Sequence, residues 1–170
     1  HPKLTGPYLG QKPPGMTPEI FAPGIVSKEG AQSKLIISPD GSEIIFKTMI
    51  ITPEQGNSPA SRIMYFENII RKDNTWGSPA ILSFSRDFVN DEPNLSGDGT
   101  KLFFVSNRPK DGSGVAQRMP DIWVVNRNGD SWSDPQNPGV PVNTEGMEVQ
   151  PFFSSDNRLY FGRMDGMYCS

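Results

Sequence analysis

Few side chains of this sequence could carry out covalent catalysis. The chain has one histidine, His1, and one cysteine, Cys169. A Ser-His-Asp triad needs a histidine inside the fold, and a histidine or cysteine metal site needs several such ligands, so both are nearly excluded. No G-x-S-x-G, P-loop or dinucleotide-binding motif is present, and Gly112-Ser113-Gly114 is typical of a flexible loop. We therefore expect no catalytic residue, no metal site and no cofactor.

Charged side chains are the better candidates, because they suit recognition rather than bond breaking. We predict that six of them bind a ligand: Asp91, Glu92, Arg108, Arg118, Glu148 and Arg163. Acids and arginines that alternate around one opening could bind a charged peptide or a glycan. The alternative interpretation is ordinary solvated loop charge with local ion pairs, each of which contributes little to stability.

The net charge and the apolar runs exclude two classes of partner. The 170-residue chain has 16 Lys and Arg against 19 Asp and Glu, a net charge of −3. Nucleic acids and anionic membranes attract a surplus of positive charge, so we expect neither. Apolar runs such as Ile44-Ile45-Phe46 are far shorter than the roughly 18 residues of a membrane span. We therefore expect no membrane insertion, and a protein or peptide partner or a glycan.

An internal repeat indicates which elements position the charged residues. Asp40, Asp98 and Asp156 follow one another at intervals of 58 residues, and the residues around them match in type. Trp76 and Trp132 lie 56 residues apart in matching segments. Each aspartate stands between two apolar strands, in a setting of turn-forming residues. We interpret these aspartates as turn formers rather than as ligands or catalysts.

Each repeat predicts four strands. In the second unit they cover about 92–96, 101–106, 121–126 and 131–139. A four-stranded antiparallel unit repeated at this length is the sequence signature of a β-propeller blade. A β-sandwich also has many short strands, but it does not predict equal intervals. We predict an all-β partial β-propeller of about two and a half four-stranded antiparallel blades.

The chain divides into a lead-in and a propeller portion. Residues 1–18 predict an extended N-terminal segment, and residues 19–170 predict the partial propeller. Its parts are a stray outer strand at 19–28, blades at 32–84 and 90–140, and a truncated blade at 148–170. An incomplete ring leaves two blade faces open, so we expect a fragment of a longer protein or a chain that self-associates through those faces.

Blade geometry places the candidate residues on one face. Turns between the first and second strands are minimal, whereas long loops at 52–61 and 107–120 join the second and third strands. Long loops on a rigid scaffold are common binding sites. Arg108 and Arg118 lie in the longer loop. The three acids open innermost strands beside it, and Arg163 follows the second strand of the third unit.

Two stretches of the sequence carry a family resemblance. The run from Ser38 to Phe46 resembles the S-P-D-G-x-x-[IL]-x-[FY] hairpin of the TolB-like propeller repeat family. The run from Asp121 through Trp132 to Phe161 is particularly similar to periplasmic propellers found beside OmpA-like domains. The resemblance covers about residues 21–161.

The resemblance implies a non-catalytic scaffold in the cell envelope, outside the cytoplasm, which recognises a protein or ligand through its long loops. The alternative is the propeller portion of an enzyme, either the lid of a prolyl-oligopeptidase-like peptidase or a glycan-processing propeller. The sequence departs from the family in two ways. Residues 32–34 lack the Glu-x-x-Pro-like opening of the later units, and the chain is too short for the usual ring of about six blades.

Overall fold

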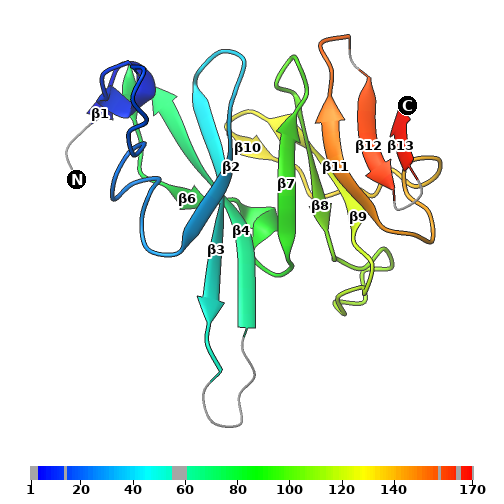
Figure 1. Ribbon diagram of the computed structural model, residues 1–170. Helices are drawn as coiled ribbons and strands as arrows, with labels where there is room; N and C mark the ends of the chain where they lie inside the picture. Colours follow the sequence, from blue (N-terminus) through cyan, green and yellow to red (C-terminus); the bar gives the residue numbers. More distant parts are fainter. Residues whose placement is uncertain (1–3, 14, 55–60, 157, 164–165, 170) are drawn as a thin grey trace.

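The computed structural model describes residues 4–13, 15–54, 61–156, 158–163 and 166–169. Three antiparallel sheets contain almost all of its regular structure, and the two 3-10 helices, η1 (Pro7–Gly10) and η2 (Ser83–Ser85), are short. The sheets stand side by side as successive blades (Figure 1). No helix in the described ranges is long and apolar enough to span a bilayer.

Each blade is an antiparallel sheet with its own strand order. The first has the order β1-β5-β4-β3-β2, with β6 paired to β4. Its strands are β1 (Leu4–Thr5), β2 (Ala31–Ile37), β3 (Glu43–Thr52), β4 (Ser61–Lys72), β5 (Thr75–Trp76) and β6 (Ala80–Ile81). The second blade, in the order β10-β9-β8-β7, comprises β7 (Asn90–Leu95), β8 (Lys101–Ser106), β9 (Asp121–Asn128) and β10 (Ser131–Trp132). The third comprises β11 (Glu148–Phe153), β12 (Leu159–Arg163) and β13 (Gly166–Cys169).

Aspartate turns join the first two long strands of the first and second blades. Ser38 Oγ donates a hydrogen bond to Asp40 Oδ1 over 2.6 Å, and the Ser42 backbone N–H donates to the same oxygen over 3.0 Å. Asp98 makes the equivalent contacts in the second blade. A glycine follows each aspartate, with φ of 67° and 71°, a backbone conformation that glycine adopts without steric cost. The interpretation of these aspartates as turn formers is confirmed.

Alternate side chains of β8 bury both faces of the second blade. Leu102 and Phe104 belong to a core shared with the first blade, whereas Phe103 and Val105 belong to a core shared with the third. Successive side chains of a strand point to opposite faces, so one strand serves both cores. Trp132, near the outer edge of the second blade, belongs to the core shared with the first blade. Stacked sheets with shared cores form the all-β partial β-propeller that the 58-residue repeat predicts.

The N-terminal residues differ from the sequence prediction. Residues 19–28, predicted as a stray outer strand, contain instead a turn in which the Ile25 backbone N–H donates to the Ala22 carbonyl over 3.0 Å. Ala22 and Gly24 have φ of 45° and 76°, and these left-handed values interrupt an extended strand. The lead-in is not fully extended either, because η1 buries Leu9 against the first blade.

Two further points concern the loop at 52–61 and the third blade. Of the loop predicted at 52–61, residues 55–60 lie outside the described residues. The third blade has one strand more than the sequence predicts, since β13 pairs with β12 along its length. Tyr168 of β13 stacks on Phe161 of β12, with ring centroids 5.8 Å apart.

Candidate functional site

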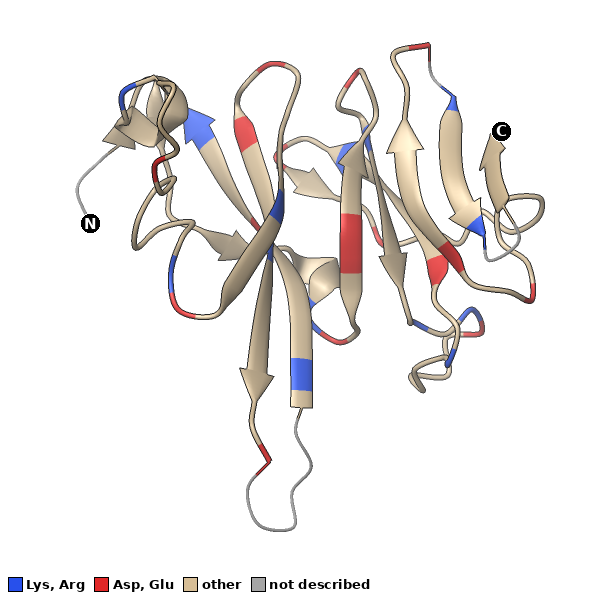
Figure 2. Ribbon diagram, viewed as in Figure 1, with Lys and Arg blue, Asp and Glu red and all other residues tan. Residues whose placement is uncertain are grey.

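The candidate residues lie at one end of the second and third blades. Strands β7 and β11 begin at this end and β8 and β12 finish there, because each pair is antiparallel. Figure 2 shows acidic segments toward the lower ends of β7 and β11 and a basic segment at the lower end of β12. The loop of residues 107–120 lies at the same end (Figure 1). The side chains nevertheless have different surroundings.

Asp91 links the first two blades. Its Oδ1 atom accepts a hydrogen bond from Lys47 Nζ of β3 over 2.6 Å. The Lys47 side chain is 11% exposed and that of Asp91 is 31% exposed, so the ion pair is partly shielded from water. A shielded pair of this kind holds the blades in register and leaves this carboxylate oxygen less available to a ligand.

Glu92 occupies a backbone bulge that recurs in every blade. Lys34, Glu92 and Gln150 have φ of 53°, 52° and 54°, and each lies where the pairing of the innermost strand shifts register. These residues are 58 positions apart, so the bulge belongs to the repeat although residues 32–34 lack the opening motif. The Glu92 carboxylate accepts a hydrogen bond from the Gln150 backbone N–H, which ties the second blade to the third.

Arg108 is buried rather than presented to solvent. The residue is 7% exposed, and its guanidinium donates to the Phe84 carbonyl over 2.9 Å and to Asn90 Oδ1 over 2.8 Å. Its central carbon lies 5.1 Å from the Phe104 ring centroid and 5.4 Å from that of Trp123. Burial lowers the pKa of Arg108 to about 10, against the opposing field of a nearby aspartate. These contacts make Arg108 part of the core at the blade end.

Glu148 and Arg163 form a pair inside the third blade. Glu148 has no exposed surface, and its Oε1 atom accepts from Arg163 Nε over 2.9 Å and from Thr144 Oγ1 over 2.6 Å. Arg163 lies over the Tyr168 ring, 4.3 Å from its centroid. Within the described residues, Oε2 of Glu148 has no hydrogen-bond partner. The pair therefore anchors the start of β11 to the end of β12.

A hollow beside the loop of residues 107–120 is the remaining place for a ligand. Its volume is about 580 Å³. It is lined by Asp87, Phe88, Arg108, Pro109, Lys110, Gly112, Gly114, Trp123 and Pro135. We call it the loop hollow. Lys110, with a side chain 45% exposed, is its accessible cation, and the exposed Arg118 lies further along the same loop outside the lining.

The loop hollow combines apolar walls with a few charged groups, as small-ligand and peptide sites do. Of the six predicted residues the structure places Arg108 in its lining. Asp91, Glu92, Glu148 and Arg163 make contacts within and between blades instead, and Arg118 is exposed. No group of three or more His, Cys, Asp or Glu side chains gathers to hold a metal ion in the part of the chain that the structure describes.

Several charged residues that are buried or paired in the fold are not predicted as candidates from the sequence. Asp121 is 1% exposed and accepts hydrogen bonds from Gln117 and Asn137, with Lys110 Nζ 3.1 Å away. Glu43, also 1% exposed, accepts from Arg127 Nη2 of the next blade over 2.6 Å. Arg127 stands 56 residues after Arg71, the interval that also separates the two tryptophan segments. This match in the sequence could have marked Arg127 as part of the repeat.

Comparisons with known proteins support the fold. No protein-family model matches the sequence, and no curated protein matches it. A solved structure of a Mycobacterium tuberculosis puromycin-hydrolyzing peptidase aligns with 86% of this chain, at a TM-score of 0.53 and 17% sequence identity. The alignment covers 22% of that chain, so the present chain spans only part of its length. A likeness at this identity shows the fold alone.

Proposed function

We propose that this chain belongs to a TolB-like propeller that recognises a protein or peptide without catalysis, at the loop end of its blades. The loop hollow carries the proposal, because it offers aromatic and proline walls with an accessible cation on a rigid scaffold. The hairpin motif from Ser38 to Phe46 supports the TolB-like assignment. The same resemblance supports a place in the cell envelope, in the periplasm.

The charges at the loop end favour an acidic or terminal carboxylate on the partner. Lys110 is half exposed at the hollow, where its Nζ also lies 3.1 Å from the buried Asp121, and Arg118 is exposed beyond it, so both can meet an anionic group that approaches from solvent. Rim charges of this kind mainly raise the association rate and fix the orientation of a partner. Aromatic walls could also stack on a sugar, and a glycan is therefore the alternative ligand.

Selection from a displayed random-peptide library on the purified chain would test this proposal. The enriched peptides are then titrated by calorimetry against wild type, Lys110→Ala and Arg158→Ala. We expect Lys110→Ala to weaken binding about fivefold, since a partly exposed charge contact contributes about 1 kcal/mol. Arg158, with a side chain 62% exposed, follows the turn at the opposite end of the third blade and serves as the matched control.

Peptides that bind both variants equally, or a library that yields no enrichment, would contradict the proposal. A glycan array run with the same two variants distinguishes the alternative ligand. Glycan binding that Lys110→Ala weakens, without any peptide binding, would transfer the site to a sugar.

The second candidate is the propeller portion of an enzyme, and the solved peptidase structure favours it. In this case the residues that break bonds would lie in another module of the same polypeptide, because the sequence offers one histidine. The reading frame on both sides of this chain decides between the two candidates. A hydrolase module in that frame, together with hydrolysis of peptides by the complete product, would replace the binding proposal.

A further inference from the structure

The face of the first blade that carries the N-terminal residues has a second cavity, which shares no lining residue with the loop hollow. N-terminal residues cover much of this face, where Leu9 and Val26 pack against Ile44, Phe46 and Ile69. The cavity that they leave has a volume of about 550 Å³. Leu35 and Ile37 of β2 line it and are 39% and 49% exposed. We call it the N-terminal groove.

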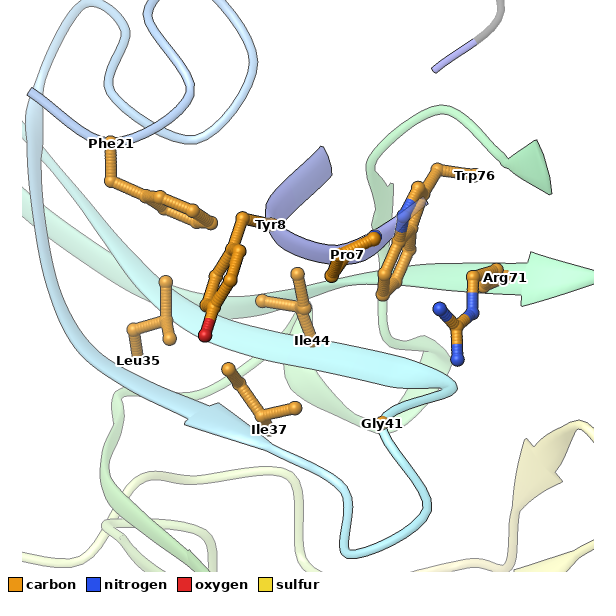
Figure 3. A pocket seen from close by; sticks show the side chains of 9 residues that line it. All are labelled: Pro7, Tyr8, Phe21, Leu35, Ile37, Gly41, Ile44, Arg71 and Trp76. Carbon is orange, nitrogen blue, oxygen red and sulfur yellow. The ribbon is translucent and has the colours of Figure 1, made fainter. Parts of the chain in front are cut away.

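Figure 3 shows how the lining of the N-terminal groove is arranged. Phe21, Tyr8 and Leu35 lie at one end, and Trp76 and Arg71 lie at the other. Of the described lining residues Arg71 alone is charged, and its guanidinium carbon lies 5.3 Å from the Trp76 ring centroid. Among the described residues, no carboxylate lies within the 4.0 Å of an ion pair with Arg71. The groove is therefore apolar with one cationic end.

The repeat supplies a filled counterpart of this groove. Arg127 and Trp132 stand 56 residues after Arg71 and Trp76 and occupy the same strands of the second blade. The Arg127 guanidinium lies over the Trp132 ring, 4.2 Å from its centroid, as Arg71 lies over Trp76. Arg127 Nη2 also donates to Glu43 Oε2 of the preceding blade over 2.6 Å, and the Glu43 side chain is 2% exposed.

The first blade packs beside Arg127 and supplies a carboxylate there. Glu43 provides the charge, and Ile45 of the same strand provides apolar surface in the shared core. At the first blade the N-terminal residues that the structure describes provide apolar surface, but none of them forms an ion pair with Arg71. The groove thus resembles the interface at Arg127, but it lacks the equivalent of the Glu43 carboxylate among the described residues.

We propose that the N-terminal groove binds an extended apolar peptide segment whose carboxylate pairs with Arg71. Arg71 is partly buried, and an arginine stacked on an indole ring is a good site for a carboxylate, because two of its N–H groups can bind the two oxygens. The exposed side chains of Leu35 and Ile37 would be covered by the apolar side chains of the peptide. This site goes beyond the loop-end recognition proposed above, since it uses another face and other residues.

A second copy of the chain does not supply the missing carboxylate. Glu43 begins β3 directly after the turn, with its carbonyl accepting from the Ser38 backbone N–H. Arg158 occupies that place in the third blade, where its carbonyl accepts from Ser154. A third blade placed before the first would therefore bring Arg158 toward Arg71, and two like charges would repel. A peptide with an acidic residue is the complementary occupant.

A blocked peptide of sequence Ser-Glu-Ile-Ile-Phe, which copies residues 42–46, is a suitable probe. Its binding is measured by calorimetry and by the change in tryptophan fluorescence, with the Gln version of the peptide as the matched ligand control. We expect saturable binding of the Glu peptide below about 1 mM, and about tenfold weaker binding of the Gln peptide, since a charge-assisted contact contributes about 1.4 kcal/mol.

Two protein variants separate binding from folding. Arg71→Gln removes the cation, and we expect it to bind the Glu and Gln peptides equally weakly. Ile37→Asn places a polar group at a half-exposed position of the lining and should weaken both peptides while the melting temperature stays unchanged. No saturable binding to wild type, or equal affinities of wild type for the two peptides, would overturn the proposal. The two proposals can fail separately, because Lys110 lines the loop hollow and not the N-terminal groove. Lys110→Ala should therefore bind both peptides as wild type does, whatever the library selection yields.

Discussion

Arginines stacked on aromatic rings recur both between and within the blades. Arg127 lies over Trp132, Arg163 over Tyr168, and Arg108 beside Phe104 and Trp123. A guanidinium can lie flat on an aromatic face and still donate hydrogen bonds from its edge, which lysine cannot do. The charges that suggest a binding site in the sequence are therefore used largely to hold β-sheets together.

Arg108 provides the clearest stability test of this role. Arg108→Met keeps most of the side-chain volume but removes the donors to the Phe84 carbonyl and to Asn90 Oδ1. We expect the free energy of unfolding to fall by about 2–3 kcal/mol, because two buried acceptors lose a charged donor. Urea unfolding measures the change, and Arg118→Met, at an exposed position of the same loop, should stay within about 0.5 kcal/mol of wild type. Equal effects of the two variants would contradict the structural role.

The turn aspartates predict how stability depends on pH. Hydrogen bonds from Ser96 Oγ and from the backbone N–H of Thr100 lower the pKa of Asp98 from its ordinary 3.8 to about 2. Because the folded pKa lies below the unfolded value, the charged carboxylate stabilises the fold above about pH 4, and this contribution is lost as the pH falls through about 2. Asp40 shows the same shift, caused first by Ser38.

Urea midpoints measured between about pH 5 and pH 2 would test this prediction, since Asp98→Asn removes one of the titrating groups. The variant should start less stable than wild type and lose less stability over that interval. Parallel curves for the two proteins would mean that Asp98 titrates alike in the folded and unfolded states.

The sequence predicts the positions of the candidate residues better than their environments. It places Arg108 in the loop after β8, which is correct, but loop membership does not reveal that the guanidinium turns back under Trp123. Likewise Glu148 is correctly placed at the opening of β11, and its complete burial depends on Arg163 from a strand that pairs with it only in the fold. Burial arises from packing between distant segments, which spacing along the chain does not encode.

At the scale of elements, the bulge of the innermost strand is the feature least visible in the sequence. Lys34, Glu92 and Gln150 adopt positive φ values that are uncommon for residues other than glycine, asparagine and aspartate. The hairpin turns were predictable because Asp-Gly pairs mark them, whereas nothing about a lysine, a glutamate and a glutamine marks a left-handed position. The strand over 19–28 was wrongly predicted for a related reason, since Ala22 takes the left-handed conformation there.

Lys34 allows the cost of the bulge to be measured. Its side chain is exposed, so a substitution tests the backbone more than the packing. A left-handed conformation costs an L-residue roughly 1–2 kcal/mol, and glycine avoids this cost but loses more entropy on folding. We expect Lys34→Gly to raise the free energy of unfolding by up to about 1 kcal/mol, and Lys34→Val to lower it by about 1 kcal/mol or more. Chemical denaturation of both variants decides the matter, and a stabilising valine would contradict the observed bulge.

At the scale of the whole molecule, the repeat predicts that the blades stack. It does not predict how the N-terminal residues, which lie outside it, cover the first blade. The alternation of Leu102, Phe103, Phe104 and Val105 already specifies a sheet that is buried on both sides. An N-terminal segment rich in proline and glycine has no such period, and its packing depends on single apolar anchors such as Leu9. The face that the repeat predicts to be open is therefore partly closed by the chain itself.

Leu9 tests whether this covering keeps the first blade from associating. Leu9 is 2% exposed and Tyr8 is 42% exposed, while their φ values of 55° and 53° are nearly equal, so the two positions share one backbone conformation. Leu9→Asp should detach the segment, because a buried aspartate without a partner costs several kcal/mol, and should uncover Ile44 and Phe46. A contiguous apolar face on a monomer promotes self-association.

We therefore expect Leu9→Asp to bind more of a hydrophobic dye and to show a light-scattering mass that rises with protein concentration. Tyr8→Asp introduces the same charge on the same backbone at an exposed site and should behave as wild type in both measurements. If both variants stay monomeric with equal dye binding, the segment does not shield the first blade. If both associate, the added charge in η1 is responsible rather than loss of the Leu9 anchor, because only one of the two residues is buried in the core that covers this face.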